Sequence, residues 1–247
     1  MKTCPICHKE NPDEAKYCMN CGMPIEIQTE QNKPIIIYYE SSEKIESQFI
    51  DVFTREHEFA NGKGKVRLLD RTPVIWERAF ANCKGLTSII IPDCVQKIGT
   101  CAFQGCENLS RVFIPDSVIV IGNSAFARCI NLSEIVIPNS VVEIESGAFD
   151  TCTSLTSVVI PESVETIGNG AFSYCSNLKS IEILNPETKI GDRAFEVCRT
   201  LSSVVIPDSL SSIGDDAFCA CDSIPDETKE KLLKINEHVF DEDDLPF

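Results

Sequence analysis

The feature that most constrains the fold is a short motif that recurs at a fixed interval. An alanine precedes each copy of a recurring phenylalanine, and a cysteine follows it three residues later. The phenylalanines stand 23 residues apart, at Phe80, Phe103, Phe126, Phe149, Phe172, Phe195 and Phe218. A period of this length is typical of a solenoid, in which each unit buries its apolar side only by stacking on its neighbours.

One repeat, CENLSRVFIPDSVIVIGNSAFAR, contains two short strand patterns separated by a turn. Val112 and Ile114 alternate with Phe113, so two side chains point inward and one points out. Pro115 lacks a backbone N–H and ends this strand. We therefore expect the strands of successive repeats to stack about 4.8 Å apart in one parallel sheet.

The recurring pattern LxxLxLPxSVxxIGxxAFxxC resembles the BspA-like, or Treponema-type, leucine-rich repeat. The resemblance covers about residues 66–224 and is highly specific. It implies a right-handed solenoid of about seven α/β-type coils, with a parallel sheet on a concave face that binds other proteins. Three departures stand out: Glu145 replaces the glycine, Leu184 replaces the proline, and the first coil around Val66 is degenerate.

The segments on either side of the repeats are predicted to cap the solenoid, because an uncapped end exposes its core. In residues 35–65 we expect an edge strand and then an amphipathic helix from Ser42 to about Phe59, with Asn61-Gly62 as its stop. In residues 225–247 we expect a helix after Pro225, with acids in its first turn, and an acidic tail.

Residues 1–24 contain two Cys-x2-Cys pairs, Cys4 with Cys7 and Cys18 with Cys21. Four thiolates in this spacing form a closed tetrahedral zinc site, which is structural rather than catalytic. A segment this short has almost no core, so the metal supplies its folding energy. Unbound or disulfide-bonded cysteines are the alternatives. The stretch resembles the zinc-ribbon modules of many bacterial proteins, and the polar residues 25–34 are expected to link it to the cap.

The recurring cysteines are expected to be buried spacers, with disulfides or a metal ladder as alternatives. Cys94, Cys101 and Cys219 lie outside this series and are predicted to be exposed thiols. Exposed thiols favour a reducing compartment. Because the N-terminus also lacks a secretory apolar region, we expect a cytoplasmic bacterial protein.

The composition excludes several classes of function. A net charge of −16 with no basic segment repels nucleic acid and anionic membranes. The apolar runs are too short for a membrane span. No phosphate loop, nucleophile elbow or metalloprotease motif is present, and the three histidines lie in separate regions. We therefore expect no enzymatic activity.

The outward positions of the predicted strands are the candidate binding surface. They combine an apolar column with an arginine and an acid, the composition of an interaction hot spot. The alternative is that valine and isoleucine simply suit strand positions. The candidate residues are Ile90, Arg111, Phe113, Glu134, Val136, Val159 and Val205.

The sequence as a whole favours a non-catalytic protein-interaction module with a structural zinc ribbon. Its partner would be a protein or peptide bound on the concave sheet. An exported adhesin or effector is the first alternative, as the resembling family is often found on bacterial surfaces. A nucleic-acid-associated zinc-ribbon factor is the second.

Overall fold

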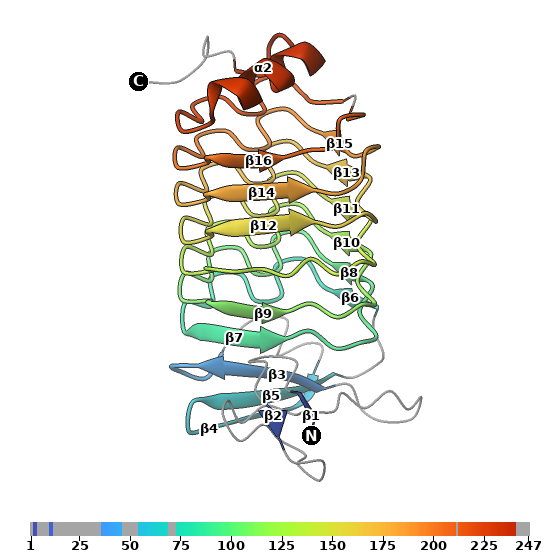
Figure 1. The fold of residues 1–247 in the computed structure, drawn as a ribbon. Helices are drawn as coiled ribbons and strands as arrows, with labels where there is room; N and C mark the ends of the chain where they lie inside the picture. Colours follow the sequence, from blue (N-terminus) through green and yellow to red (C-terminus); the bar gives the residue numbers. More distant parts are fainter. Residues whose placement is uncertain are drawn as a thin grey trace.

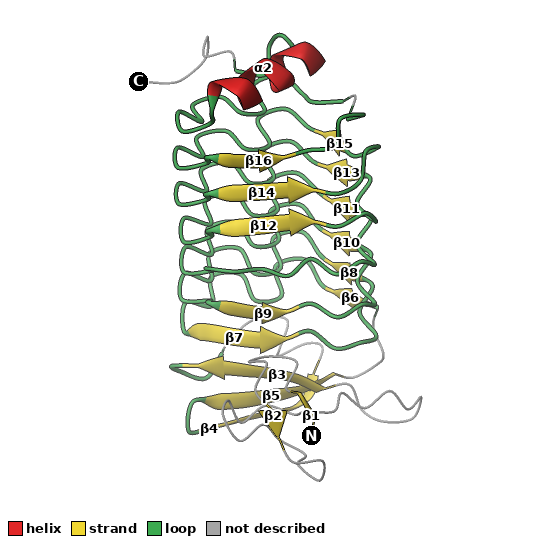
Figure 2. Cartoon of the chain, in the orientation of Figure 1, coloured by secondary structure: helices red, strands yellow, loops and turns green. Residues whose placement is uncertain are grey.

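The computed structural model describes residues 2–3, 10–11, 36–45, 54–68, 73–210 and 212–240. Figure 1 shows the repeats stacked into one column, with strands β3 to β5 at one end and helix α2 at the other. Longer strands lie on one side of the column and two-residue strands lie on the opposite side (Figure 2). The predicted leucine-rich-repeat solenoid is confirmed.

The longer strands pair in parallel, each shifted from the last by one repeat. For example, Val158 of one coil pairs with Ile181 of the next. The pairing stops between the second and fourth coils, because Glu134–Val136 forms no strand. The expectation of one continuous parallel sheet is therefore wrong at this coil. The strands are β7 (Leu86–Ile90), β9 (Arg111–Phe113), β12 (Ser157–Ile160), β14 (Ser180–Ile183) and β16 (Ser203–Val205).

The short strands form an uninterrupted six-stranded parallel sheet on the opposite side of the column. The second residue of each is a buried isoleucine. A parallel bridge between Ile190 and Ile213 adds a seventh coil. The strands are β6 (Val74–Ile75), β8 (Lys97–Ile98), β10 (Val120–Ile121), β11 (Glu143–Ile144), β13 (Thr166–Ile167) and β15 (Lys189–Ile190).

The recurring phenylalanines form a continuous stack through the core. From Phe80 to Phe218 all seven rings are fully buried, and neighbouring centroids lie 5.1 to 5.4 Å apart with nearly parallel planes. Main-chain bonds hold this register: Phe126 N–H, for example, donates to the Ala148 carbonyl 2.8 Å away. The alanines before the rings are also fully buried, because each coil closely approaches the next at this turn.

The repeat glycine is required where coils come closest. A Cβ atom on Gly122 would lie 2.5 Å from the carbonyl oxygen of Ile98, which is shorter than any normal contact. Glu145 occupies the equivalent position one coil later. Its carboxylate binds the Lys97 ammonium at 2.7 Å and the Asn123 N–H at 2.8 Å, so this coil accommodates a side chain by linking it to two preceding coils.

The N-terminal cap is a β-structure, and the predicted helix is wrong where the structure describes it. Residues Thr54–Ala60 form β4 and Lys63–Leu68 form β5, joined by Asn61-Gly62 with positive φ at both residues. This is the backbone geometry of a two-residue type I′ hairpin, which competes with a helix stop at such a dipeptide. Residues 46–53 of the expected helix lie outside the described part.

Strand β3 (Ile36–Ser41) joins this hairpin to the solenoid. It pairs antiparallel with β5 on one side and with β7 on the other. It is therefore an internal strand and not the predicted edge strand. Val66, expected in a first degenerate coil, belongs to β5 and faces the core, so the parallel coils begin at Val74.

The C-terminal cap contains the predicted helix, α2 (Asp226–Ile235), with Asp226 and Glu227 in its first turn. Leu232 and, beyond the helix, Val239 are fully buried against the last coil. The Ser223 hydroxyl, two residues before Pro225, donates to the Arg199 carbonyl at 2.7 Å and so links the start of the cap to the preceding coil. The helix covers the open end of the column in Figure 1.

Candidate functional site

The ladder cysteines are ordered by hydrogen bonds rather than by disulfides. The thiol of Cys129 donates to the Phe103 carbonyl at 3.2 Å, and the same bond recurs in five further coils at 3.0 to 3.3 Å. Every cysteine in the described part of the chain is a free thiol. Burial raises the pKa of Cys129 and of Cys175 to about 12, so these thiols are poor nucleophiles.

The cysteines outside the ladder are less exposed than predicted. Cys101 is buried and Cys219 is almost fully buried, while Cys94 is partly buried. The prediction of exposed thiols is wrong because the turns that carry Cys101 and Cys219 are covered by neighbouring coils. Exposed thiols therefore no longer support the inference that the protein resides in a reducing compartment.

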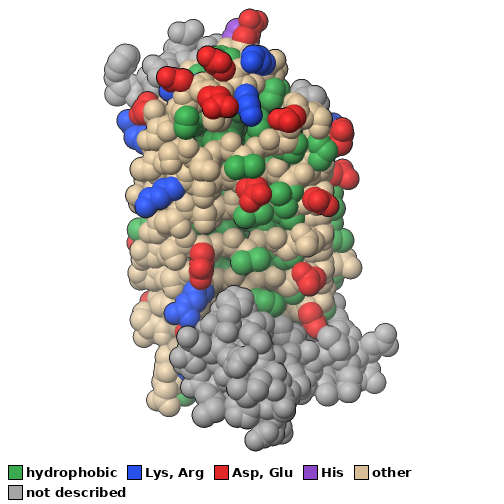
Figure 3. Space-filling model, viewed as in Figure 1, with side chains coloured by type: hydrophobic (Ala, Val, Ile, Leu, Met, Phe, Trp, Pro, Cys, Tyr) green, Lys and Arg blue, Asp and Glu red, His purple; other side chains and the backbone are tan. Residues whose placement is uncertain are grey.

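Among the candidate binding residues, Phe113, Val136, Val159 and Val205 stand at equivalent repeat positions on the side of the longer strands, whereas Arg111 and Glu134 stand two residues earlier in their coils. Val159, Glu182 and Val205 are directly paired neighbours in β12, β14 and β16. Val136 is 73% exposed, Val159 49% and Val205 51%. Figure 3 shows hydrophobic side chains running down the middle of this face. We call Phe113, Val136, Val159, Glu182 and Val205 the central column.

The cap shortens this column at its N-terminal end. Ile90, predicted to be outward and available, is only 5% exposed. It lies opposite Tyr38 of β3, and the neighbouring Ser88 hydroxyl donates to the Glu40 carboxylate at 3.2 Å. Because cross-strand neighbours from the cap contact this end of the sheet, the accessible column begins at Phe113, which is half-buried.

Charged residues flank the central column. Glu134 and Arg111 stand two residues before column positions and are exposed. Asp116, Glu162 and Asp208 follow the strand-ending prolines and are also exposed. In the described part of the chain, none of these carboxylates takes part in an ion pair. Acidic side chains border the hydrophobic strip in Figure 3.

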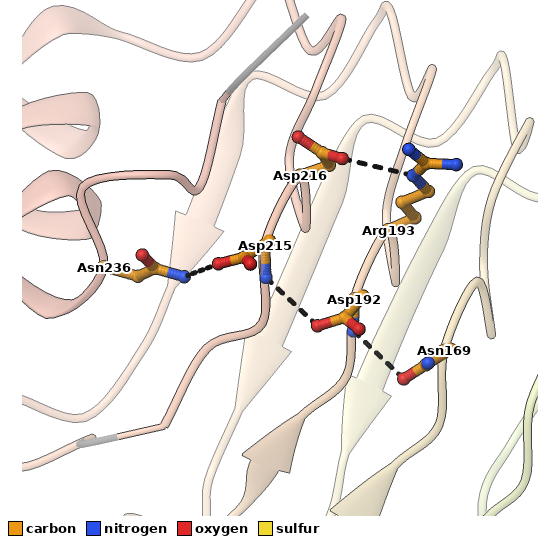
Figure 4. Close-up of polar contacts among 6 residues, drawn as sticks. All are labelled: Asn169, Asp192, Arg193, Asp215, Asp216 and Asn236. Carbon is orange, nitrogen blue, oxygen red and sulfur yellow. Dashed lines mark hydrogen bonds and ion pairs between the residues drawn. The ribbon is translucent and has the colours of Figure 1, made fainter. Parts of the chain in front are cut away.

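A second polar feature lies at the turns near the C-terminal cap and was not anticipated. The Asp192 N–H donates to the Asn169 side-chain oxygen at 3.1 Å, and the Asp215 N–H donates to Asp192 at 3.1 Å. Asn236 of the cap then donates to the Asp215 carboxylate at 2.9 Å (Figure 4). The signal in the sequence is the Asn or Asp that follows the repeat glycine.

The chain of hydrogen bonds from Asn169 to Asn236 borders an open hollow of about 430 Å³. Gly170, Arg193, Glu196 and Asp216 also line this hollow. Arg193 donates to the Asp216 carboxylate at 3.2 Å. Burial, together with nearby Asp216, raises the pKa of Glu196 even though Arg193 lowers it. The carboxylates of Asp192 and Asp215 accept hydrogen bonds from the next coil and from the cap, so this arrangement links the last coils to the helical cap.

The four predicted zinc ligands lie outside the described residues. The flanking strands β1 (Lys2–Thr3) and β2 (Glu10–Asn11) are described and pair antiparallel. Cys4 and Cys7 stand between them in the sequence. Among the described residues, no group of His, Cys, Asp or Glu side chains is arranged to hold a metal.

None of the described helices has the length and apolarity needed to span a membrane.

Comparison with known proteins identifies both parts of the chain. The family model for the BspA type leucine rich repeat region matches residues 73–199 and 144–245, in 6 copies. The model for the zinc-ribbon domain matches residues 3–25. No curated protein matches the chain significantly.

Solved structures agree with the repeat assignment. A leucine-rich-repeat protein of T. pallidum is 36% identical with a TM-score of 0.62, over 66% of this chain and 76% of that one. A leucine-rich cell surface protein from Faecalibacterium prausnitzii is 35% identical with a TM-score of 0.54, over 68% of this chain but 44% of that one. The repeat model matches more than half of the sequence. The chain therefore belongs to the BspA-type leucine-rich-repeat family, and it carries a zinc-ribbon domain at its N-terminus.

Proposed function

We propose that this chain is a non-catalytic scaffold that binds a protein or peptide on the face of its longer strands. The observation that carries the proposal is the central column, in which Val136, Val159 and Val205, on three of four successive coils, stay about half exposed or more. An aligned apolar strip on a soluble protein is typical of an interaction surface. The preference of valine for strands explains each valine taken alone. The buried core of the solenoid, however, does not need these exposed side chains.

The absence of catalytic groups is part of this proposal. The Cys152 thiol, for example, donates to the Phe126 carbonyl, and burial holds its pKa above the ordinary value. His57 lies in the cap and His238 beyond α2, at opposite ends of the solenoid. A nucleophile needs a base within hydrogen-bonding reach, and no such pair involves a ladder thiol among the described residues.

The zinc ribbon is proposed to fold around one structural zinc ion held by Cys4, Cys7, Cys18 and Cys21. The donor set fits: four cysteines in two Cys-x2-Cys pairs provide the tetrahedral thiolate ligands that zinc prefers. When bound, the metal supplies folding energy to a segment with almost no core. The ribbon would then add a second contact or mediate self-association.

We propose a cytoplasmic location. The exposure of thiols no longer supports it, but oxidising compartments favour disulfides, and every cysteine in the described part of the chain is a free thiol. Export to the cell surface is the second candidate, and one observation favours it. A related structure is described as a leucine-rich cell surface protein, and it shares 35% identity with this chain. Fractionation of the host cells distinguishes the two locations directly.

Affinity capture from host lysate tests the binding proposal. The intact protein is compared with a Val136→Asp, Val159→Asp variant whose fold is verified by circular dichroism. The matched control is Ile119→Asp, because Ile119 is a 43% exposed apolar residue beside the short strand β10. We expect the double variant to lose a specific protein that the control retains. Equal capture by all three proteins contradicts the proposal.

A further inference from the structure

The central column and its flanking acids point to one class of partner, and this inference rests on the proposed function. We propose that the face of the longer strands binds a cationic amphipathic helix, with apolar side chains on the ridge that meets the valines and Lys or Arg on the flank that meets the acids after the strand-ending prolines. The occupant is identified from the charge around the column, from the spacing of the coils and from the single acid inside the column.

Charge is the first argument. Five exposed carboxylates border or interrupt the apolar strip. They are Asp116, Glu134, Glu162, Glu182 and Asp208. Arg111 and Lys179 are the nearby cations at the starts of β9 and β14. Because none of the five acids forms an ion pair within the described residues, the face has negative charge that only a cationic partner can neutralise.

The same charges argue against the chain itself as the occupant. A second copy placed face to face would bring the acidic borders of two columns together, and like charges in an interface cost several kcal/mol. The C-terminal segment DEDDLPF is acidic as well. A nucleic acid is disfavoured for the same reason.

Spacing is the second argument. Equivalent side chains of successive coils repeat at 5.1 to 5.4 Å in the phenylalanine stack. An α-helix presents one side chain per turn along a ridge, with a pitch of about 5.4 Å. An extended strand repeats on one face only about every 6.7 Å. Paired strands lie about 4.8 Å apart, so over the four steps from Phe113 to Val205 a helix along the column drifts from register by only about 2.4 Å, whereas a strand drifts by about 7.6 Å.

Glu182 makes the proposal specific. It occupies the column position between Val159 and Val205 and is exposed. A helix in register places one ridge residue against this carboxylate. The ridge is therefore expected to carry apolar side chains at most turns and a Lys or Arg at the turn that meets Glu182, because an apolar group there would leave the acid desolvated and unpaired.

The test uses the full-length protein and a labelled synthetic peptide of about 18 residues, with leucines along one ridge, one lysine in that ridge and lysines along one flank. Two control peptides are compared, one with the same composition in scrambled order and one with every lysine replaced by glutamate. Fluorescence anisotropy measures the dissociation constants at low and at physiological salt. Variants of verified fold are Val136→Asn with Val159→Asn, which removes the apolar surface without adding charge, Glu182→Lys, and the control Ile119→Asn.

We expect the lysine peptide to bind at least about tenfold more tightly than either control, and to weaken as salt rises. The Val136→Asn, Val159→Asn variant and Glu182→Lys should each weaken binding about tenfold, while Ile119→Asn should not. In the Glu182→Lys variant, replacing the ridge lysine by glutamate should restore binding. Equal binding of the scrambled peptide, or no binding of the lysine peptide, overturns the inference. If capture from lysate still depends on Val136 and Val159, the proposed function survives that failure.

Discussion

The thiol of Cys152 donates a hydrogen bond to the Phe126 carbonyl one coil earlier, 3.2 Å away. The ring of the same residue, Phe126, stacks on the Phe149 ring with centroids 5.3 Å apart. The cysteine therefore does more than fill a space between phenylalanine and leucine. It adds a side-chain bond between coils to the main-chain bonds that already join them at this turn.

This bond predicts an order of stability among substitutions at Cys152. Serine keeps a hydroxyl donor in place of the weak thiol donor, whereas alanine removes the donor and leaves a small cavity. We expect Cys152→Ala to lower the free energy of unfolding by about 1–3 kcal/mol, and Cys152→Ser to lower it less. Urea unfolding monitored by circular dichroism measures both. If alanine is tolerated better than serine, the cysteine acts as an apolar spacer.

The buried thiols also predict a loss of stability at alkaline pH. Burial raises the pKa of Cys129 and Cys175 to about 12, above the value of about 8.5 in the unfolded chain. Below pH 8 both states hold the proton, and stability is unaffected. Between about pH 9 and 12 the unfolded state loses protons that the folded state keeps. Stability should therefore fall by about 1.4 kcal/mol per pH unit for each such thiol.

A pH series of urea unfolding between pH 7 and 11 measures this effect. A Cys129→Ala, Cys175→Ala variant is the control, since it has two fewer titrating thiols. Its stability should be lower at pH 7 but should decline less steeply above pH 9. Parallel declines of the two proteins would show that other groups cause the alkaline unfolding.

The backbone conformation at Tyr174 predicts that this position tolerates glycine better than alanine. Its φ of +57° lies in the left-handed region, which Gly105 occupies at the equivalent position of another coil. An L side chain pays about 1–2 kcal/mol there, and glycine does not. We expect Tyr174→Gly to be about 1 kcal/mol more stable than Tyr174→Ala, although both lose the same ring. Thermal or urea unfolding of the pair measures the difference, and a more stable alanine variant would contradict it.

The packing of the C-terminal cap predicts that replacing Leu232 by alanine lowers stability strongly, whereas replacing its neighbour Leu233 lowers it little. Leu232 is fully buried against the last coil, whereas Leu233 is 44% exposed on the same helix. We expect Leu232→Ala to cost about 2–4 kcal/mol and to increase aggregation, because the end of the core becomes accessible. Leu233→Ala should cost well under 1 kcal/mol. Similar losses would mean that the helix does not seal the column.

The zinc proposal predicts one metal ion per chain that is lost without unfolding the repeats. Elemental analysis of the purified protein should give about one zinc, and Cys4→Ser with Cys21→Ser should remove it. The melting temperature of the solenoid should be unchanged by this double substitution, because the predicted ligands lie outside the repeat region. A protein that contains no zinc when purified in the presence of the metal would contradict the proposal.

The period of 23 residues was enough to predict the solenoid. The recurring phenylalanines and the alanines before them can all be buried only if the repeats stack on one another, and all of them are buried. The hairpin of the N-terminal cap was missed. The apolar residues Ile45, Phe49, Val52 and Phe53, which precede the hairpin, fit one face of a helix, and Asn61-Gly62 suits both a helix stop and a type I′ turn. Only the pairing of β3 with β5 and β7, a long-range contact, decides between them.

The candidate face was predicted from alternation within single repeats, and the outward positions from Phe113 to Val205 are where the alternation placed them. The prediction that Ile90 is exposed was wrong because the N-terminal cap covers it. The alternation within one repeat does not show that β3 of the cap pairs beside that repeat. The burial of Cys101 and Cys219 was missed for a similar reason: both stand in turn positions that polar residues fill in other coils, and coil-to-coil contact decides their exposure.

Photo-crosslinking tests the central claim most directly, because it locates the bound partner on the molecule. A photoreactive amino acid is placed at Val159 on the central column and, in a second protein, at Ile119 beside the short strands. Each protein is irradiated in host lysate and its adducts are identified by mass spectrometry. We predict a specific protein adduct from position 159 that position 119 does not form. The same adduct from both positions, or from position 119 alone, would contradict binding on the face of the longer strands.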